Sequence, residues 1–129
     1  MDEDFKIEIV SPESSFFSSE NVKEVIVPAF EGEMGILKNH ISIISFLKPG
    51  IIKVLSNKSE DKFYVDDGIM EFKDNELSIL TSTIFNINNI DKKFVENSIK
   101  DAENILQNNE LNDQNRFLAN EKISVLKSI

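Results

Sequence analysis

The stretch Phe5-Lys6-Ile7-Glu8-Ile9-Val10 alternates apolar and charged residues near the start of the chain. A period of two places each kind of side chain on its own face, which is typical of a half-buried β-strand. Two further strands are expected, at Val22–Val27, which runs into Pro28, and at the apolar run Ile51–Leu55, which follows the turn signal Pro49-Gly50. Proline cannot donate to a central ladder, so we expect the second strand to end there. The first part of the chain therefore reads as a series of short strands.

Further along, the segments Lys62–Val65 and Ile69–Phe72 flank Asp66-Asp67-Gly68. An Asp-Gly pair supplies the positive φ of a tight turn, so we expect these two strands to form a hairpin. Asp74-Asn75 is expected to turn the chain again into the strand Leu77–Leu80. Short strands with turn signals at roughly 8–12-residue spacing predict an antiparallel β-sandwich, which we assign to residues 1–87.

After about residue 88 the apolar period becomes helical. Asn88 or Asn89 is expected to cap a first helix, with Asp91 in its first turn, and Gln107–Asn109 is expected to interrupt it before a second helix from about Asn112. The apolar positions of the first helix that share one face are Phe94, Ile99, Ala102, Ile105 and Leu106. Residues 88–129 thus predict an antiparallel two-helix hairpin, and the fold class is α+β in two parts. Its apolar stripe is narrow, so the hairpin must pack against something else.

Composition excludes several functions. The 129-residue chain carries a net charge of −9, which argues against nucleic acid and against anionic lipid headgroups. It has no cysteine, and its single histidine, His40, cannot build a zinc cluster or a catalytic triad alone. No apolar run approaches the roughly 20 residues that span a bilayer, and the acidic start Met1–Asp4 is unlike a signal peptide. We therefore expect no metal, no cofactor and no direct lipid contact.

One segment, Pro28–His40 (PAFEGEMGILKNH), resembles the signature loop of the epsilon subunits of bacterial F-type ATP synthases, which are homologous to the mitochondrial delta subunit. That loop usually reads Glu-Gly-Glu-hydrophobic-Gly-hydrophobic, followed by a short link to a histidine. The resemblance continues at Val10–Glu13, at Leu47–Ile52 (LKPGII) and at Asp67–Phe72 (DGIMEF). The ordered set covers residues 5 to about 85 and agrees with the sandwich-then-hairpin architecture.

The resemblance implies a non-catalytic subunit of a proton-transporting ATP synthase. It would lie in the central stalk, peripheral on the cytoplasmic face of the bacterial inner membrane, and bridge the gamma subunit and the membrane ring of c subunits. The hairpin would give it a further partner in the catalytic beta subunits. In this role the chain would couple proton-driven rotation of the ring to the catalytic head.

The residues themselves predict that Gly32 and Gly35 bracket a turn that can approach another backbone closely. Glu31 and Glu33 are then expected to project two carboxylates from this turn. By resemblance, these acids would pair with basic groups of the ring, Met34 would pack against the ring or gamma, and His40 would lie at gamma. The family's prolines around the histidine are replaced in Lys38–Ser42, which predicts a looser loop. The interface residues implied are Glu31, Gly32, Glu33, Met34, Gly35 and His40.

Some members of this family bind ATP on the hairpin through an Ile/Leu-Asp-x-x-Arg-Ala motif. In the corresponding stretch Ile90–Val95, Asp91 is kept, but Phe94 stands in the arginine's place, and the second helix offers only Arg116. A phenyl ring cannot supply the donor fork that phosphate recognition favours, so we predict no nucleotide binding. Relatives can also insert the hairpin into the catalytic head, helped by basic residues. Residues 88–129 carry 7 acids and 6 bases, so we expect inhibition of ATP hydrolysis to be weak or absent.

Catalysis is not expected from the chain itself. Asp66-Asp67 and Glu60-Asp61 are neighbouring carboxylates, but adjacent strand residues point to opposite faces and cannot act as an acid/base pair. The main alternative is a free-standing β-sandwich module that binds a peptide or glycan, and one tyrosine with no tryptophan disfavours glycan stacking. A jelly-roll or cupin-type enzyme is a second alternative, which the single histidine disfavours.

Overall fold

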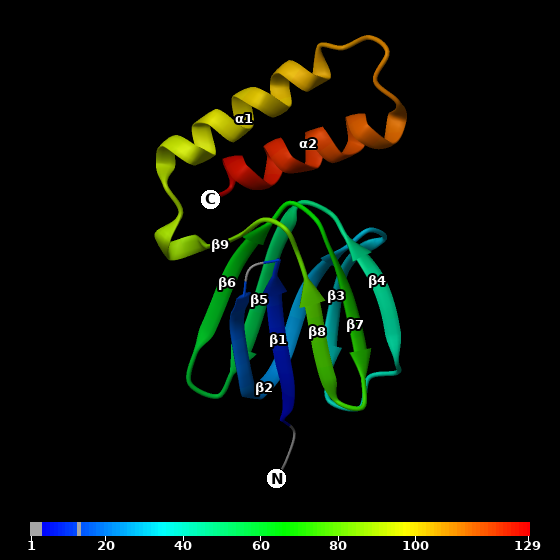
Figure 1. The fold of residues 1–129 in the computed structure, drawn as a ribbon, viewed down its shortest axis with the longest axis vertical. Helices are drawn as coiled ribbons and strands as arrows, with labels where there is room; N and C mark the ends of the chain where they lie inside the picture. Colours follow the sequence, from blue (N-terminus) through cyan, green and yellow to red (C-terminus); the bar gives the residue numbers. More distant parts are fainter. Residues whose placement is uncertain (1–3, 13) are drawn as a thin grey trace.

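The computed structural model describes residues 4–12 and 14–129, so the acidic start at 1–3 and Glu13 lie outside the described residues. Strands build a sandwich, and two helices lie across one end of it, while the first strand begins at the opposite end (Figure 1). The strands are β1 (Phe5–Ser11), β2 (Ser14–Ala29), β3 (Gly32–Leu37), β4 (Ile43–Leu47), β5 (Gly50–Ser56), β6 (Glu60–Val65), β7 (Gly68–Lys73), β8 (Glu76–Leu80) and β9 (Ile84–Asn86). A 3-10 turn, η1 (Ile87–Asn89), leads to α1 (Lys92–Leu106) and α2 (Asp113–Lys127). The predicted sandwich followed by a helical hairpin is confirmed.

β2 links the two layers of the sandwich. It is 16 residues long; its first half pairs with β1, and its second half pairs with β3 and β5. The strands follow the order β1-β8-β7-β4-β2-β5-β6-β9, with β3 on β2, and all pairs are antiparallel except β1 with β8. Pro28 lies one residue before the end of β2, as predicted. The serine-rich first half of β2 was not predicted, because its period-2 apolar pattern is weak.

The predicted hairpin around Asp66-Asp67-Gly68 is wrong. β6 pairs with β5 and β9, whereas β7 pairs with β4 and β8, so this segment crosses from one layer to the other. The Asp67 carbonyl accepts a hydrogen bond from Thr81 Oγ1 at 2.7 Å, which ties the crossing to the end of β8. The predicted turn at Asp74-Asn75 is confirmed, with φ values of 52° and 58° between paired strands β7 and β8.

The helical hairpin begins differently from the prediction. Asp91 is itself the N-cap of α1 and accepts from the Lys93 amide at 3.0 Å, while Asn86 caps η1. The predicted caps Asn88 and Asn89 are therefore wrong, because the 3-10 turn occupies these positions. Asn112 caps α2, accepting from the Asn115 amide at 2.7 Å. The boundary between residues 87 and 88 stays a prediction, and the last strand ends at Asn86.

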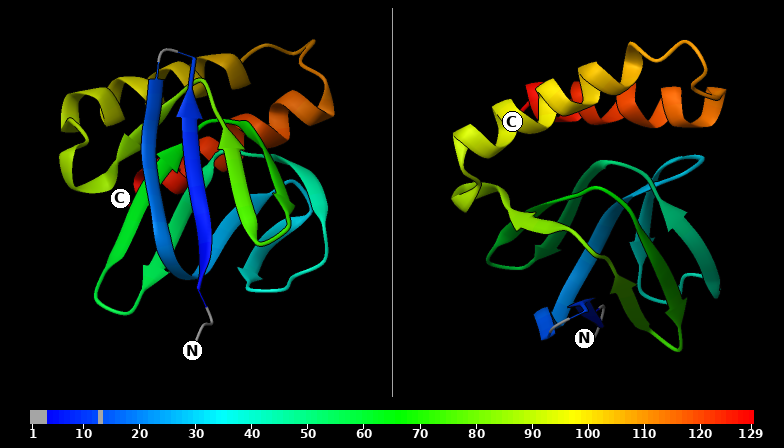
Figure 2. Two further views of the ribbon diagram at one scale, coloured as in Figure 1. Left: turned by 60° about the horizontal axis from the view of Figure 1, so that its bottom comes forward. Right: turned by 45° about the horizontal axis from the view of Figure 1, so that its top comes forward.

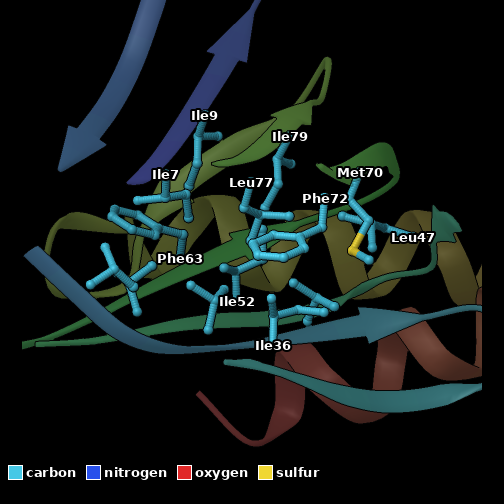
Figure 3. Packing of buried hydrophobic residues seen from close by; sticks show 14 of the residues in the cluster. Ile7, Ile9, Ile36, Leu47, Ile52, Phe63, Met70, Phe72, Leu77 and Ile79 are labelled. Atoms are coloured by element: carbon cyan, nitrogen blue, oxygen red, sulfur yellow. The ribbon is translucent and has the colours of Figure 1, made fainter. Parts of the chain in front are cut away.

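The core lies between the two layers, where inward side chains of both sheets meet (Figure 3). Phe5, Ile7 and Ile9 are all buried, so the alternating stretch is a strand with its apolar side chains on the core face, as predicted. Phe5 packs edge-on against Phe72, with ring centroids 5.6 Å apart. Each Phe or Ile buried here contributes roughly 1.5–3 kcal/mol to folding.

The two helices pack against each other and across the end of the sandwich, as the right-hand view of Figure 2 shows. Ala102, Ala119 and Leu126 are buried, whereas most of the other residues of both helices remain exposed or half-buried. The narrow apolar stripe of the hairpin thus packs against the sandwich, as predicted.

Candidate functional site

The acidic segment 31–35 occupies a turn and the start of a strand. Phe30 and Glu31 form the turn between β2 and β3, where Ala29 pairs with Gly32. Glu31 and Glu33 are both exposed. The predicted turn bracketed by Gly32 and Gly35 is therefore wrong, because both glycines belong to β3. The projection of two carboxylates into solvent, expected from the sequence, is what the structure shows.

Residues of β3 alternate between the core and the outer face. Met34 is half-buried and packs against the core, so only the exposed part of its side chain is open to a partner. Gly32 has a φ of 140°, which an L side chain rarely adopts. At Gly35 an added Cβ would meet the Glu24 carboxylate at 3.0 Å, the mobile end of a flexible side chain. Of Gly32 and Gly35, only Gly32 has a backbone conformation that favours glycine.

His40 lies beyond the other end of β3. Six residues of strand separate it from the Glu31 turn, a span of roughly 20 Å. The Asn39 amide N–H donates to Asn75 Oδ1 at 2.7 Å, and Asn75 Nδ2 donates to Asn39 Oδ1 at 3.1 Å. His40 Nδ1 donates to the Ile41 carbonyl at 2.8 Å, and its ring lies edge-on to Phe72. These hydrogen bonds between Asn39 and Asn75 restrain the loop, which was predicted to be looser because it lacks the family's prolines. The length of β3 places His40 far from Glu31.

An apolar outer face, which the sequence did not predict, lies on β4, β7 and β8. Phe46 on β4 pairs with Ile69 on β7, which in turn pairs with Leu80 on β8, so their side chains form one row. These residues and Ile44 are 43–67% exposed. A groove of about 560 Å³ lies along the row, bordered also by Pro12 and Thr81. Clustered exposed apolar side chains of this kind mark protein-interaction surfaces. The signal in the sequence was that β4, β7 and β8 carry apolar residues on their outward face as well as on their inward face.

Two neighbouring residues of α2, with opposite charges, form ion pairs with the sandwich. Glu121 Oε1 lies 2.7 Å from Lys48 Nζ, and Lys122 Nζ lies 3.4 Å from Asp66 Oδ1. The Lys48 ammonium also lies 5.4 Å from the centroid of the Phe117 ring, which faces Phe30. We call this set the hairpin seat; its residues are Phe30, Lys48, Asp66, Phe117, Glu121 and Lys122.

Buried Tyr64 supports the seat from below. Its hydroxyl donates to Asp66 Oδ1 at 2.6 Å, which orients the carboxylate toward Lys122. Burial, the hydrogen bond to Asp66 and the charge of Asp66, in that order, hold the pKa of Tyr64 far above its ordinary value. The phenol therefore stays protonated and acts as a donor.

The place of a nucleotide-binding arginine is taken by an aromatic contact. Phe94 on α1 packs against Phe85 on β9, with ring centroids 4.4 Å apart. The sole arginine, Arg116, donates from Nη1 to the Leu106 carbonyl and from Nη2 to the Asn108 carbonyl, both at 3.3 Å. Both positions therefore serve the packing of the hairpin.

Within residues 4–12 and 14–129, no group of three or more His, Asp or Glu side chains could hold a metal ion. In the same part of the chain, no helix is long and apolar enough to cross a membrane. A sandwich with an exposed apolar face, an acidic turn and a seated hairpin belongs to the class of protein-binding chains.

Comparison with known proteins makes the assignment specific. Residues 4–87 match the family model of the ATP synthase delta/epsilon chain β-sandwich domain, and the chain belongs to this family. It is 61% identical over 129 residues to the ATP synthase epsilon chain of Pelagibacter ubique, covering 100% of this chain and 99% of that one. It is 31% identical over 110 residues to epsilon chain 2 of Nitrobacter hamburgensis, covering 85% and 80%. The predicted family and the non-catalytic character of the chain are thereby confirmed.

Solved structures share the fold. The chain superposes with a TM-score of 0.79 on a chain of the Euglena gracilis mitochondrial ATP synthase, at 20% identity, covering 99% of this chain and 82% of that one. For a chain of the central stalk and c-ring of the Tetrahymena thermophila enzyme the TM-score is 0.63 at 14% identity, covering 95% and 93%.

Proposed function

We propose that the chain is a central-stalk subunit that bridges the gamma subunit and the c-subunit ring and so transmits rotation between ring and catalytic head. The observation that carries this proposal is the presence of two different exposed surfaces on one sandwich. One is the apolar outer face of Phe46, Ile69 and Leu80, and the other is the acidic turn with Glu31 and Glu33. The structures of related complexes from Euglena and Tetrahymena, which contain a c-ring, support the same placement.

The apolar outer face is suited to gamma. A permanent partner in a rotating stalk must resist torque, and permanent interfaces are more apolar than transient ones. Phe46, 63% exposed, would supply the central aromatic anchor, and aromatic anchors carry much of the binding energy at interfaces. Ile41 and Ile44 are exposed near the His40 loop, so the same partner could reach His40, as the sequence resemblance implied.

The acidic turn is suited to the polar loops of the ring. Glu31 and Glu33 are exposed, and residues 1–87 carry 16 acids against 8 bases, so the sandwich attracts basic groups. Through these partners the chain would be peripheral on the cytoplasmic face of the inner membrane, without contacting lipid itself.

The hairpin, residues 88–129, is proposed as a second unit with a limited regulatory role. Phe94 and Arg116 are both committed to packing, which supports the absence of nucleotide binding. Its balanced charge gives little attraction to an acidic segment of the catalytic beta subunits, so inhibition of hydrolysis would be weak.

Co-purification tests the proposal. The tagged full-length chain, expressed with the other subunits of its ATP synthase, should be recovered with gamma and the catalytic head. A chain that is recovered alone, although folded by circular dichroism, would contradict the stalk assignment and favour the free-standing binding module.

A further inference from the structure

The acidic turn and the hairpin seat have Phe30 in common. Phe30, which precedes Glu31 in the turn, faces Phe117 of α2 with ring centroids 6.5 Å apart and planes tilted by 39°. The turn is therefore supported on one side by the hairpin, although the two are far apart in the sequence.

Backbone hydrogen bonds join the same turn to Lys48. The Phe30 amide donates to the Phe46 carbonyl at 3.0 Å, and the Lys48 amide donates to the Pro28 carbonyl at 3.0 Å. Lys48 in turn holds Glu121 through a contact in which both side chains are largely buried, with 17% and 27% exposed. Backbone hydrogen bonds thus connect the turn to the β4–β5 loop, and the ion pair of Lys48 with Glu121 connects that loop to α2.

We propose that docking of α2 in the hairpin seat and binding of a basic partner at Glu31 and Glu33 are linked, each strengthening the other. The proposal rests on the proposed function, since the partner it names is the basic surface of the ring. A docked hairpin orders the turn before binding and so lowers the conformational entropy lost on association. Linkage requires that the partner, once bound, favours the docked hairpin by the same factor.

The charge of Lys48 gives the linkage its sign. In the docked hairpin, Glu121 neutralises this ammonium. When α2 leaves, the Lys48 ammonium loses this partner. Because the Lys48 backbone is hydrogen-bonded to Pro28, just before the acidic turn, the freed charge would repel a basic partner there and compete with it for Glu31. The loss of Glu121 alone should therefore weaken the partner's binding more than the loss of both charges.

The first test uses the isolated full-length chain and amide hydrogen exchange along α2. Phe30→Ala lies outside the helices, yet it should raise α2 exchange about fivefold, the lower end of typical coupling. Phe16→Ala is the control, because it also removes a phenyl ring from an aromatic pair, here with Phe63, but at a site outside the hairpin seat. Equal α2 exchange in the two variants would overturn the proposal.

The second test measures binding of the full-length chain to purified c-ring in detergent. Glu121→Gln should weaken binding about fivefold, and Lys48→Gln combined with it should restore part of the loss. Glu20→Gln, which breaks an exposed ion pair with Lys6, should change nothing. If wild type binds and Glu121→Gln binds equally well, the linkage fails while the proposed function stands. If wild type does not bind the ring, the ring contact of the proposed function fails, and the linkage with it.

Discussion

Replacing Phe94 with arginine tests whether this position serves packing or phosphate recognition. Phe94 and Phe85 are both half-buried with ring centroids 4.4 Å apart, and their contact holds α1 to β9. An aromatic pair contributes about 1 kcal/mol beyond its burial, and half-burial of a phenyl ring contributes about 1 kcal/mol more. Phe94→Arg should therefore destabilise docking of the first turns of α1 by about 2 kcal/mol, roughly a 30-fold increase in local opening.

Amide hydrogen exchange of residues 93–98 measures this opening, and Phe94→Leu, which keeps an apolar side chain, is the matched control. Titration calorimetry with ATP should show no binding below the millimolar range for wild type or for Phe94→Arg. The reason is that Arg116, the only native arginine, is held by the Leu106 and Asn108 carbonyls. Unchanged exchange in Phe94→Arg, or submillimolar ATP binding by wild type, would refute the reasoning.

Three further predictions concern the stability and the regulation of the chain. Gly68→Ala would place a Cβ 2.9 Å from the Leu80 carbonyl oxygen and should lower the free energy of unfolding by about 1–3 kcal/mol, seen as a reduced Tm; Gly35→Ala, beside a flexible side chain, should cost less. Because the folded pKa of Tyr64 is raised, its stabilising contribution is complete below the unfolded pKa of about 10 and is lost as pH rises above it. Urea unfolding at pH 8 and pH 11 should show a larger loss of stability for wild type than for Tyr64→Phe. Truncation after Asn88 should leave ATP hydrolysis by the complex nearly unchanged, and a several-fold rise would show that the hairpin inhibits.

Local patterns in the sequence predicted most of the fold. Alternation at Phe5–Val10 and the turn at Asp74-Asn75 depend on neighbouring residues, and both have the predicted structure. The connection through Asp66–Gly68 does not depend on neighbours alone. Its course is decided by pairing with β9 and β4, elements that are distant in the sequence, and by the hydrogen bond from Thr81.

The same distinction applies to the candidate site. The exposed position of Glu31 and Glu33 follows from an acidic turn, which the sequence displays directly. The row of Phe46, Ile69 and Leu80 exists only because three strands are in register, and no single stretch of sequence reveals it. Likewise, the contact of Lys48 with Glu121 joins residues 73 positions apart.

The acidic turn with Glu31 and Glu33 and the apolar face with Phe46 should be separable in a direct binding measurement. Purified gamma and purified c-ring are each immobilised, and the affinity of the full-length chain for both is measured. Phe46→Ser should weaken binding to gamma by about 2 kcal/mol, roughly 30-fold, and leave binding to the ring unchanged. The double variant Glu31→Gln/Glu33→Gln should weaken binding to the ring alone. A bridge built from these two surfaces would be contradicted if either variant lost binding to both partners. It would also be contradicted if both variants kept binding to both partners.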